Sequence, residues 1–137
     1  MRHILSLLLE NEPGALSRMT LVTSGDDAII EQITKQLNKL VDVVKLMDVS
    51  EGAYIERELL MVKVKAATAA ARDEIARLTS AFRGQVVDIT RSSYVVEVTG
   101  TGDKLEAFIA ALDPASIIEL VRSGPSAISR GAKALRS

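Results

Sequence analysis

The second half of the chain, residues 59–121, alternates between two spacings of its apolar residues, in an order that few folds accommodate. Segments 59–66, 85–90, 92–100 and 116–121 are short and apolar, and the clearest of them alternate apolar with polar side chains, as strands with one wet face do. Segments 69–82 and 102–112 instead repeat apolar residues every three or four positions, which is typical of amphipathic helices. The predicted order is βαββαβ, the ferredoxin-like arrangement in which both helices cover one face of a four-stranded antiparallel sheet.

The two predicted helices each carry one apolar stripe. In the strand over 59–66, Leu60, Val62 and Val64 alternate with polar or exposed positions, and we expect the core to form between this row and the helices. Gly84 follows the first helix and is a plausible C-terminal stop. The helix stripes are Ala71, Ile75, Leu78 and Phe82 in the first, and Leu105, Phe108, Ile109 and Leu112 in the second.

The first half of the chain repeats only part of this pattern. Residues 3–10 and 19–23 read as strands, 24–40 as the clearest helix in the chain, and 41–49 as a further strand. The segment "LVTSGDDAIIEQI" is similar to "EVTGTGDKLEAFI" in the second half, although strands that lead into a Gly-Asp helix start are also common by chance. Interpreted as a duplication, the similarity makes the first half a module of the same fold that lacks one helix and one strand between Gly14 and Met19.

The predicted fold class is therefore α+β, with two ferredoxin-like modules and antiparallel sheets. We expect an N-terminal domain over residues 1–49, a linker over 50–58 and a C-terminal domain over 59–137 that ends in a basic tail. The tail, "SGPSAISRGAKALRS", contains Arg130, Lys133 and Arg136 and no acidic residue. Two interpretations stay open for it, a solvated tail or a docking segment for an acidic partner surface.

Composition excludes several classes of function. The 17 basic and 18 acidic residues give a net charge of −1, so no bulk electrostatic attraction to nucleic acid or to an anionic membrane is expected. The absence of cysteine rules out disulfides, thiolate metal sites and cysteine nucleophiles. Only Tyr54 and Tyr94 lie outside the helix stripes among the aromatic residues, too few for an RNA-stacking platform. The apolar run after His3 is too short for a membrane span or a signal peptide, so we expect a cytoplasmic protein.

No arrangement of residues in the sequence predicts catalysis. The single histidine, His3, lies at the edge of the first strand, and a Ser-His-Asp triad would have to use it. No serine lies in a Gly-x-Ser-x-Gly turn, and no metal-ligand spacing is present. The acidic pair Asp26-Asp27 fits the first turn of a helix. We therefore expect no catalytic residue and no metal site.

The segment "ENEPGAL", residues 10–16, is the one candidate for a ligand site. Gly14 lets a ligand approach the main chain, and Asn11 can both donate and accept hydrogen bonds. If a helix began just after Gly14, free amides near Ala15 and Leu16 would bind a carboxylate. We therefore predict a ligand-binding loop, although most Pro-Gly pairs are only turns. Its residues are Asn11, Pro13, Gly14, Ala15 and Leu16.

Five stretches of the sequence together resemble a known family. They are "RHILSLLLENEPGALSR", "SRMTLVTSGDDAIIEQITKQLNKLVDVVKLMDV", "ERELLMVKV", "FRGQVVDIT" and "RSGPSAISRG". In this order they resemble the small, regulatory subunit of acetolactate synthase, also called acetohydroxyacid synthase. The resemblance covers essentially the whole chain, and "ENEPGALSR", "KQLNKLVDVVKL" and "FRGQ" are its most specific parts.

The resemblance implies a fold, partners and a role. In that family the N-terminal half is an ACT domain, a ferredoxin-like module that binds amino acids, and the C-terminal half is a second module of related fold. The small subunit performs no chemistry and has no cofactor. It forms a homodimer and binds the catalytic large subunit, which carries thiamine diphosphate, Mg and FAD. It raises that subunit's activity and usually confers feedback inhibition by valine or another branched-chain amino acid.

The sequence departs from the family inside the predicted ligand loop. Family members usually continue after "GALSR" with a helix and a strand before a second "LSRMT", whereas here Arg18 is followed directly by Met19. Asn11, Gly14 and the backbone of Ala15 and Leu16 match the family's effector loop, but its second asparagine, in the missing strand, has no counterpart. The resemblance therefore leaves an alternative, an effector-insensitive subunit that assembles with and activates the large subunit without binding an amino acid.

The shortened first module generates a prediction about assembly. A domain of about 49 residues with one helix is near the size at which a chain needs outside help to bury a core. We expect its uncovered sheet face to be protected by a second copy or by the second module. Light scattering on the purified chain tests this: a dimer supports the expectation, and a monodisperse, well-folded monomer would contradict it.

Overall fold

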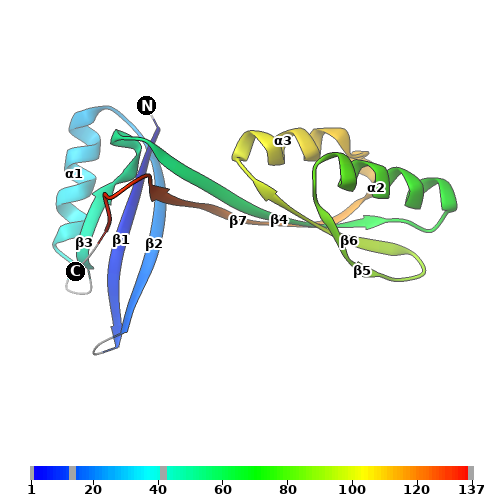
Figure 1. Ribbon diagram of the computed structural model, residues 1–137, viewed down its shortest axis with the longest axis horizontal. Coiled ribbons are helices and arrows are strands. Elements are labelled where there is room, and N and C mark those ends of the chain that lie inside the picture. The colour runs from blue at the N-terminus through cyan, green and yellow to red at the C-terminus, as the bar shows by residue number, and fades with distance from the viewer. Residues whose placement is uncertain (1, 13–14, 41–42, 136–137) are drawn as a thin grey trace. The chain divides into compact units, whose positions relative to one another are not determined.

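The structure is a computed structural model that describes residues 2–12, 15–40 and 43–135, without the side chains of 11–12 and 15–16. The chain forms two compact units (Figure 1). The first comprises residues 1–56 together with 126–137, and the second comprises residues 57–125. Two antiparallel sheets with helices confirm the predicted α+β class.

The second unit has the predicted ferredoxin-like topology. Its sheet has the strand order β5-β6-β4-β7, and both helices cover one face of it (Figure 1). β4 and β6 pair antiparallel from Glu58 opposite Gly100 to Lys65 opposite Ser93. The elements are β4 (Tyr54–Lys65), α2 (Ala69–Ala81), β5 (Gln85–Ile89), β6 (Ser93–Gly100), α3 (Gly102–Ala111), the short 3-10 helix η2 (Pro114–Ser116) and β7 (Ile117–Ser129).

The core of the second unit lies where the sequence pattern predicts it. Leu60, Val62 and Val64 of β4 are almost fully buried under the helices, as is Phe108 of α3. The rings of Phe82 and Phe108 meet edge to face with centroids 5.2 Å apart, an arrangement that aromatic pairs prefer. Burial of each such side chain contributes about 1.5–3 kcal/mol, so this cluster accounts for much of the unit's stability.

Gly84 has a different role from the predicted helix stop. The residue in the left-handed backbone region after α2 is Arg83, with φ 57°, and not Gly84. A Cβ on Gly84 would lie only 2.6 Å from the carbonyl oxygen of Glu97 and 2.8 Å from the side chain of Val98. Gly84 is therefore required because the chain passes close to β6 at this point.

The first unit is a shortened version of the second. It contains β1 (Arg2–Glu12), β2 (Ala15–Ser24), α1 (Asp27–Asn38), β3 (Val43–Asp48) and the 3-10 helix η1 (Val49–Glu51), with strand order β2-β1-β3. Matching β1, β2 and β3 to β4, β6 and β7 reproduces the order of the second sheet, and α1 then matches α3. Within the described residues, the first unit has no counterpart of α2 or β5, as predicted.

β2 begins four residues earlier than the predicted strand. The segment 15–18 pairs with β1, which leaves a long hairpin whose register runs from Arg2 opposite Ser24 to Glu12 opposite Ala15. Without a helix in this segment, its main-chain groups are satisfied by extending the ladder to β1.

The end of the chain, residues 126–137, belongs to the first unit, whereas the sequence pattern placed it in the C-terminal domain over 59–137. Ala127 is buried against Ile4 and Val49, and its carbonyl accepts a hydrogen bond from Arg18 Nη2 at 3.1 Å. The amide of Arg130 donates to the carbonyl of Ala53 at 3.0 Å. The segment predicted as a linker, 50–58, holds part of η1 and the start of β4.

One arginine joins three segments of the second unit. Arg72 on α2 donates to the carbonyl oxygens of Ala66 at 2.7 Å, Thr90 at 2.6 Å and Arg91 at 2.8 Å. Its guanidinium carbon also lies 5.1 Å from the centroid of the Tyr94 ring, within the range of a cation–π contact. A single side chain thus fastens α2 to the turn between β5 and β6.

We expect Arg72→Met to lower the free energy of unfolding of the second unit by about 1–3 kcal/mol, because it leaves three carbonyl groups without their charged donor. Urea denaturation measures this. Arg77→Met, on the same helix but with an exposed side chain and no hydrogen-bond partner among the described residues, is the matched control. Equal effects of the two substitutions would contradict the assigned role of Arg72.

Candidate functional site

The predicted ligand loop spans the end of β1 and the start of β2. Asn11 belongs to the end of β1, and Ala15 and Leu16 begin β2; Pro13 and Gly14 lie outside the described residues. Leu16 is paired with Glu10, and Ala15 with Glu12. The segment after residue 14 is therefore a strand, and no helix N-terminus follows the loop. Assignment of these five residues to a ligand site stays a prediction.

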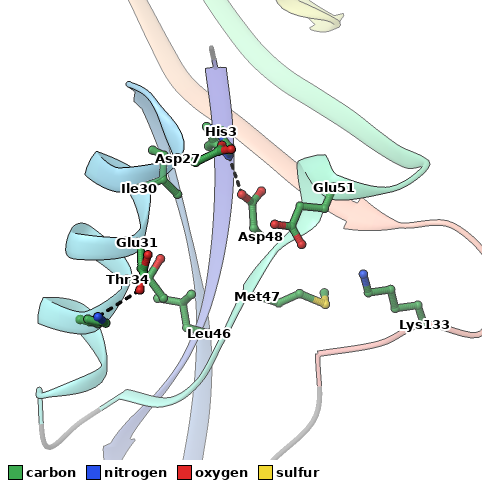
Figure 2. A pocket seen from close by; sticks show the side chains of 11 residues that line it. His3, Asp27, Ile30, Glu31, Thr34, Leu46, Met47, Asp48, Glu51 and Lys133 are labelled. Carbon is green, nitrogen blue, oxygen red and sulfur yellow. Dashed lines mark hydrogen bonds and ion pairs between the residues drawn. The ribbon is translucent and has the colours of Figure 1, made fainter.

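A cavity of about 670 Å³ lies elsewhere in the first unit (Figure 2). Residues from α1, β3, η1 and the end of the chain surround it, together with one residue of β1. Sequence reasoning did not find this site, because its residues are far apart in the chain and follow no motif. The lining residues are His3, Asp27, Ile30, Glu31, Thr34, Lys35, Leu46, Met47, Asp48, Glu51 and Lys133.

His3 and Asp48 form the polar centre of this cavity. His3 Nδ1 lies 2.6 Å from Asp48 Oδ2, and His3 is only 7% exposed. The other ring nitrogen, Nε2, is buried and has no hydrogen-bond partner among the described residues. Most buried polar atoms are paired, so this unpaired nitrogen is an exception.

Ser50 completes a group of serine, histidine and aspartate, but its bonding differs from that of a catalytic triad. The Ser50 amide donates to Asp48 Oδ1 at 3.0 Å, and the Ser50 hydroxyl donates to the same oxygen. In a triad the serine hydroxyl bonds to the histidine nitrogen remote from the aspartate. Here Ser50 and His3 both hydrogen-bond to the Asp48 carboxylate. They stabilise that carboxylate, and the Ser50 hydroxyl is not activated as a nucleophile.

The environment of Asp48 favours its ionised form. Burial raises the pKa of Asp48, but the hydrogen bonds from Ser50 and His3 together outweigh burial and hold the pKa below its ordinary value. Asp48 is therefore a carboxylate at neutral pH and keeps its hydrogen bond to the ring of His3.

A second polar cluster lies in the second unit. Arg122 on β7 binds both oxygens of Glu58 on β4, with Nε and Nη2 at 3.0 and 3.1 Å, and its third nitrogen binds Glu106 on α3. Glu58 is 9% exposed. These hydrogen bonds raise the pKa of Arg122 above its usual value, so the arginine stays charged. The cluster joins two strands and a helix and has a structural role.

Other kinds of site are absent from the described parts of the chain. No three histidine, aspartate or glutamate side chains there are placed to hold a metal ion. None of the helices in those parts has the length and apolar character needed to cross a bilayer.

The fold defines a class first: a protein of ACT type, with one complete ferredoxin-like unit and one shortened unit. Comparison with known families then identifies the particular family within this class. The family model for the small subunit of acetolactate synthase matches residues 57–131, and the model for the small-subunit-like ACT domain of the same enzyme matches residues 5–45. The chain belongs to the family of acetolactate synthase small subunits, as the resemblance implied.

Individual relatives agree with this assignment. The acetolactate synthase isozyme 3 small subunit of Salmonella typhimurium is 44% identical over 164 residues, which cover 99% of this chain and 100% of the relative. The Haemophilus influenzae small subunit is 45% identical over 161 residues, covering 97% and 98%. The crystal structure of the Thermotoga maritima small subunit superimposes with a TM-score of 0.85 at 32% identity, covering 97% and 99%. All three are named as small subunits of acetolactate synthase.

The length of these alignments supports a shortened first module. The Salmonella alignment runs over 164 residues, whereas this chain has 137, so at least 27 aligned positions have no residue here. A helix averages about 11–12 residues and a strand about 5–6, so one helix and one strand with their connections fill such a gap.

The geometry around Asp48 predicts a pH-dependent stability. Its lowered pKa contributes stability above about pH 4, where an unfolded-chain aspartate is ionised, and this contribution is lost as the pH falls through the folded-state pKa. We expect Asp48→Asn to reduce the free energy of unfolding most at neutral pH and hardly at all in strong acid. Denaturant titrations across this pH range measure the difference. Asp73→Asn, at an exposed position on α2, should show no such trend; a pH-independent loss in Asp48→Asn would contradict the assignment.

Proposed function

We propose that this chain binds the catalytic large subunit of acetolactate synthase, activates it, and makes it sensitive to a branched-chain amino acid, with valine as the first candidate. The observation that carries the proposal is the family match along nearly the whole chain, which includes an ACT-like domain over residues 5–45. In the proposed complex the large subunit supplies thiamine diphosphate, Mg and FAD, and this chain supplies no catalytic group.

The proposed mechanism is a coupling between two binding events. A regulatory subunit shifts its partner between states of different activity, and an effector bound to the first unit changes the populations of those states. Such couplings are typically worth about 1–3 kcal/mol and are reciprocal, so the large subunit must change the affinity for the amino acid by the same factor as the amino acid changes the affinity for the large subunit.

A second candidate function has a specific observation in its favour. β2 begins at Ala15 and is paired with β1 there, so the amides after residue 14 lie in a strand and lack the aligned dipole of a helix N-terminus. Loss of two charge-assisted contacts of about 1.5–3 kcal/mol each would weaken amino-acid binding by tens to thousands of times. The second candidate is therefore a subunit that assembles with and activates the enzyme but no longer senses an amino acid.

We also propose a cytoplasmic homodimer with a sensing domain over residues 1–49 and a second domain over 59–137. The limits of the two matching family models, 5–45 and 57–131, support this functional division. β2 is an edge strand, and Met19 and Val22 on it are 46% and 41% exposed. An edge strand with exposed apolar side chains favours pairing with another chain.

Reconstitution with the large subunit tests the proposed function. Adding this chain should raise acetolactate formation, and valine should then inhibit it and give heat of binding in calorimetry. Asn11→Ala should weaken inhibition about tenfold or more while activation is retained, because it removes a polar contact to the effector. Asn38→Ala, the same change at an exposed position on α1, is the matched control.

Each outcome separates the candidates. Activation together with inhibition that depends on Asn11 supports the regulatory subunit. Activation without inhibition and without heat of binding supports the effector-insensitive subunit. Failure of the chain to bind or activate the large subunit overturns both.

A further inference from the structure

A second cavity of the first unit is lined by residues of β2, β3 and the end of the chain. Its volume is about 190 Å³, which is about six times the volume that a water molecule takes up in the liquid. Met47 and Lys133 line both this cavity and the larger one around His3 (Figure 2). The second cavity is therefore large enough to hold a small organic molecule.

The basic tail forms one side of this second cavity. The chain turns at Gly131, whose φ of 75° lies in the left-handed region that favours glycine. Ser129 before the turn and Lys133 after it both line the cavity. The tail, for which the sequence left a solvated segment and a docking segment open, thus contributes a lysine to a cavity of the first unit.

Arg18 lines the cavity from β2 and is held there by neutral groups. Its Nη2 donates to Ser6 Oγ at 3.2 Å and to the carbonyl oxygen of Ala127 at 3.1 Å. Ser6 and Ala127 are themselves buried, so the guanidinium is anchored to the core of the unit. Its Nε and Nη1 have no hydrogen-bond partner and no carboxylate among the described residues. Since an arginine carries five N–H donors, part of this anchored group is free to bind an anion.

Two further donors of the lining also lack partners in the part of the chain that the structure describes. Lys133 forms no ion pair there, either with Glu51 of the larger cavity or with another carboxylate. The half-buried Ser129 forms no side-chain hydrogen bond there. None of the described residues that line this cavity is acidic. The lining therefore favours an anion, because hydrogen bonds from cations to carboxylates are about twice as strong as neutral ones.

Most of the remaining lining is apolar. Met47, Ile128 and Leu135 supply hydrocarbon surface, and Ile128 is 54% exposed, so it has apolar surface left to cover. A ligand with an aliphatic body gains from covering this surface, whereas a phosphate ion has no such body. The ammonium group of an amino acid would find no acidic acceptor among the described lining residues. The lining thus suits an aliphatic acid better than phosphate or an amino acid.

We propose that this cavity binds the carboxylate of a small aliphatic acid, with the free N–H groups of Arg18 and the ammonium of Lys133 as donors. The hydrocarbon part of the acid then lies against Met47, Ile128 and Leu135. This binding requires neither the large subunit nor the predicted effector loop, so it goes beyond the proposed function.

A nuclear magnetic resonance titration of the intact chain with isobutyrate tests the proposal. Isobutyrate should bind in the millimolar range or tighter and shift the amide signals of Ser129, Gly131 and Lys133. Isobutyramide, a neutral molecule of the same shape, should bind about tenfold more weakly or not at all, because it forms no charge-assisted hydrogen bond with the two cations. Inorganic phosphate should also bind more weakly, because it covers no apolar surface.

Two variants test the proposed donors. Lys133→Met should weaken isobutyrate binding about tenfold or more, because a charged donor is lost. Lys39→Met, the same change at an exposed lysine without an ion pair in the described chain, is the matched control. Arg18→Met should abolish binding, with circular dichroism as the check that the chain is folded. Lys133 has no partner to lose, so its variant tests the site even where Arg18→Met unfolds.

The proposal is overturned if isobutyrate does not bind, if isobutyramide binds equally well, or if Lys133→Met and Lys39→Met bind isobutyrate equally well. Phosphate binding as tight as that of isobutyrate would contradict an aliphatic ligand. Isobutyrate binding that is lost in Asn11→Ala but unaffected by Lys133→Met would place the acid at the predicted loop and overturn this site.

The tests also separate this site from the other interpretation of the tail and from the proposed function. If isobutyrate does not bind and Lys133→Met loses affinity for the large subunit, the tail is a docking segment for an acidic partner surface and the cavity site is overturned. Isobutyrate binding is measured on this chain alone, so binding that requires Lys133 supports the site even where reconstitution of the enzyme fails.

Discussion

Burial of β1 on both faces is the constraint on which the first unit depends. Residues 3–7 are all buried, because β1 is the central strand between β2 and β3 and each of its faces is covered. Ile4 contacts Val49 and Ala127 on one face, and the cavity beside α1 lies next to His3 on the other. This explains why the strand is a continuous apolar run and not an alternating one. The predicted effector loop and the cavity both lie beside this strand, one near each end.

The parts of the fold that could be predicted are those specified by local sequence patterns. The second unit was predictable because each element carries its own apolar period, as Leu60, Val62 and Val64 illustrate, and because the βαββαβ order admits few topologies. The missing helix and strand of the first unit were predictable from comparison of the two halves of the chain. The position of the tail was not predictable. The amide of Arg130 donates to the carbonyl of Ala53, and no local sequence pattern specifies a hydrogen bond between residues so far apart in the chain.

The predicted loop and the cavity beside α1 show the same contrast between local sequence patterns and contacts between distant residues. The loop over residues 10–16 could be proposed because its residues are contiguous. The strand that begins at Ala15 was not predicted, because it depends on pairing with β1. Of the residues that line the cavity, His3 had been considered in the sequence analysis. Its hydrogen-bond partner, Asp48, is 45 positions away in the chain. The burial of one ring nitrogen of His3 likewise depends on the packing of distant segments. Gly84 is similar: its need for glycine comes from the nearby carbonyl of Glu97.

The division of the chain also determines the order in which its units can fold during synthesis. The second unit is a continuous segment, residues 57–125, inserted into the first, whose last part is residues 126–137. A ribosome therefore releases everything the second unit needs before it releases the residues that cover Ile4 and Val49. Domains generally fold as units and usually from the N-terminus, but here the C-terminal one is complete first. The first unit is thus the last to be finished, and loss of even a short C-terminal segment would remove residues that pack against its N-terminal strand.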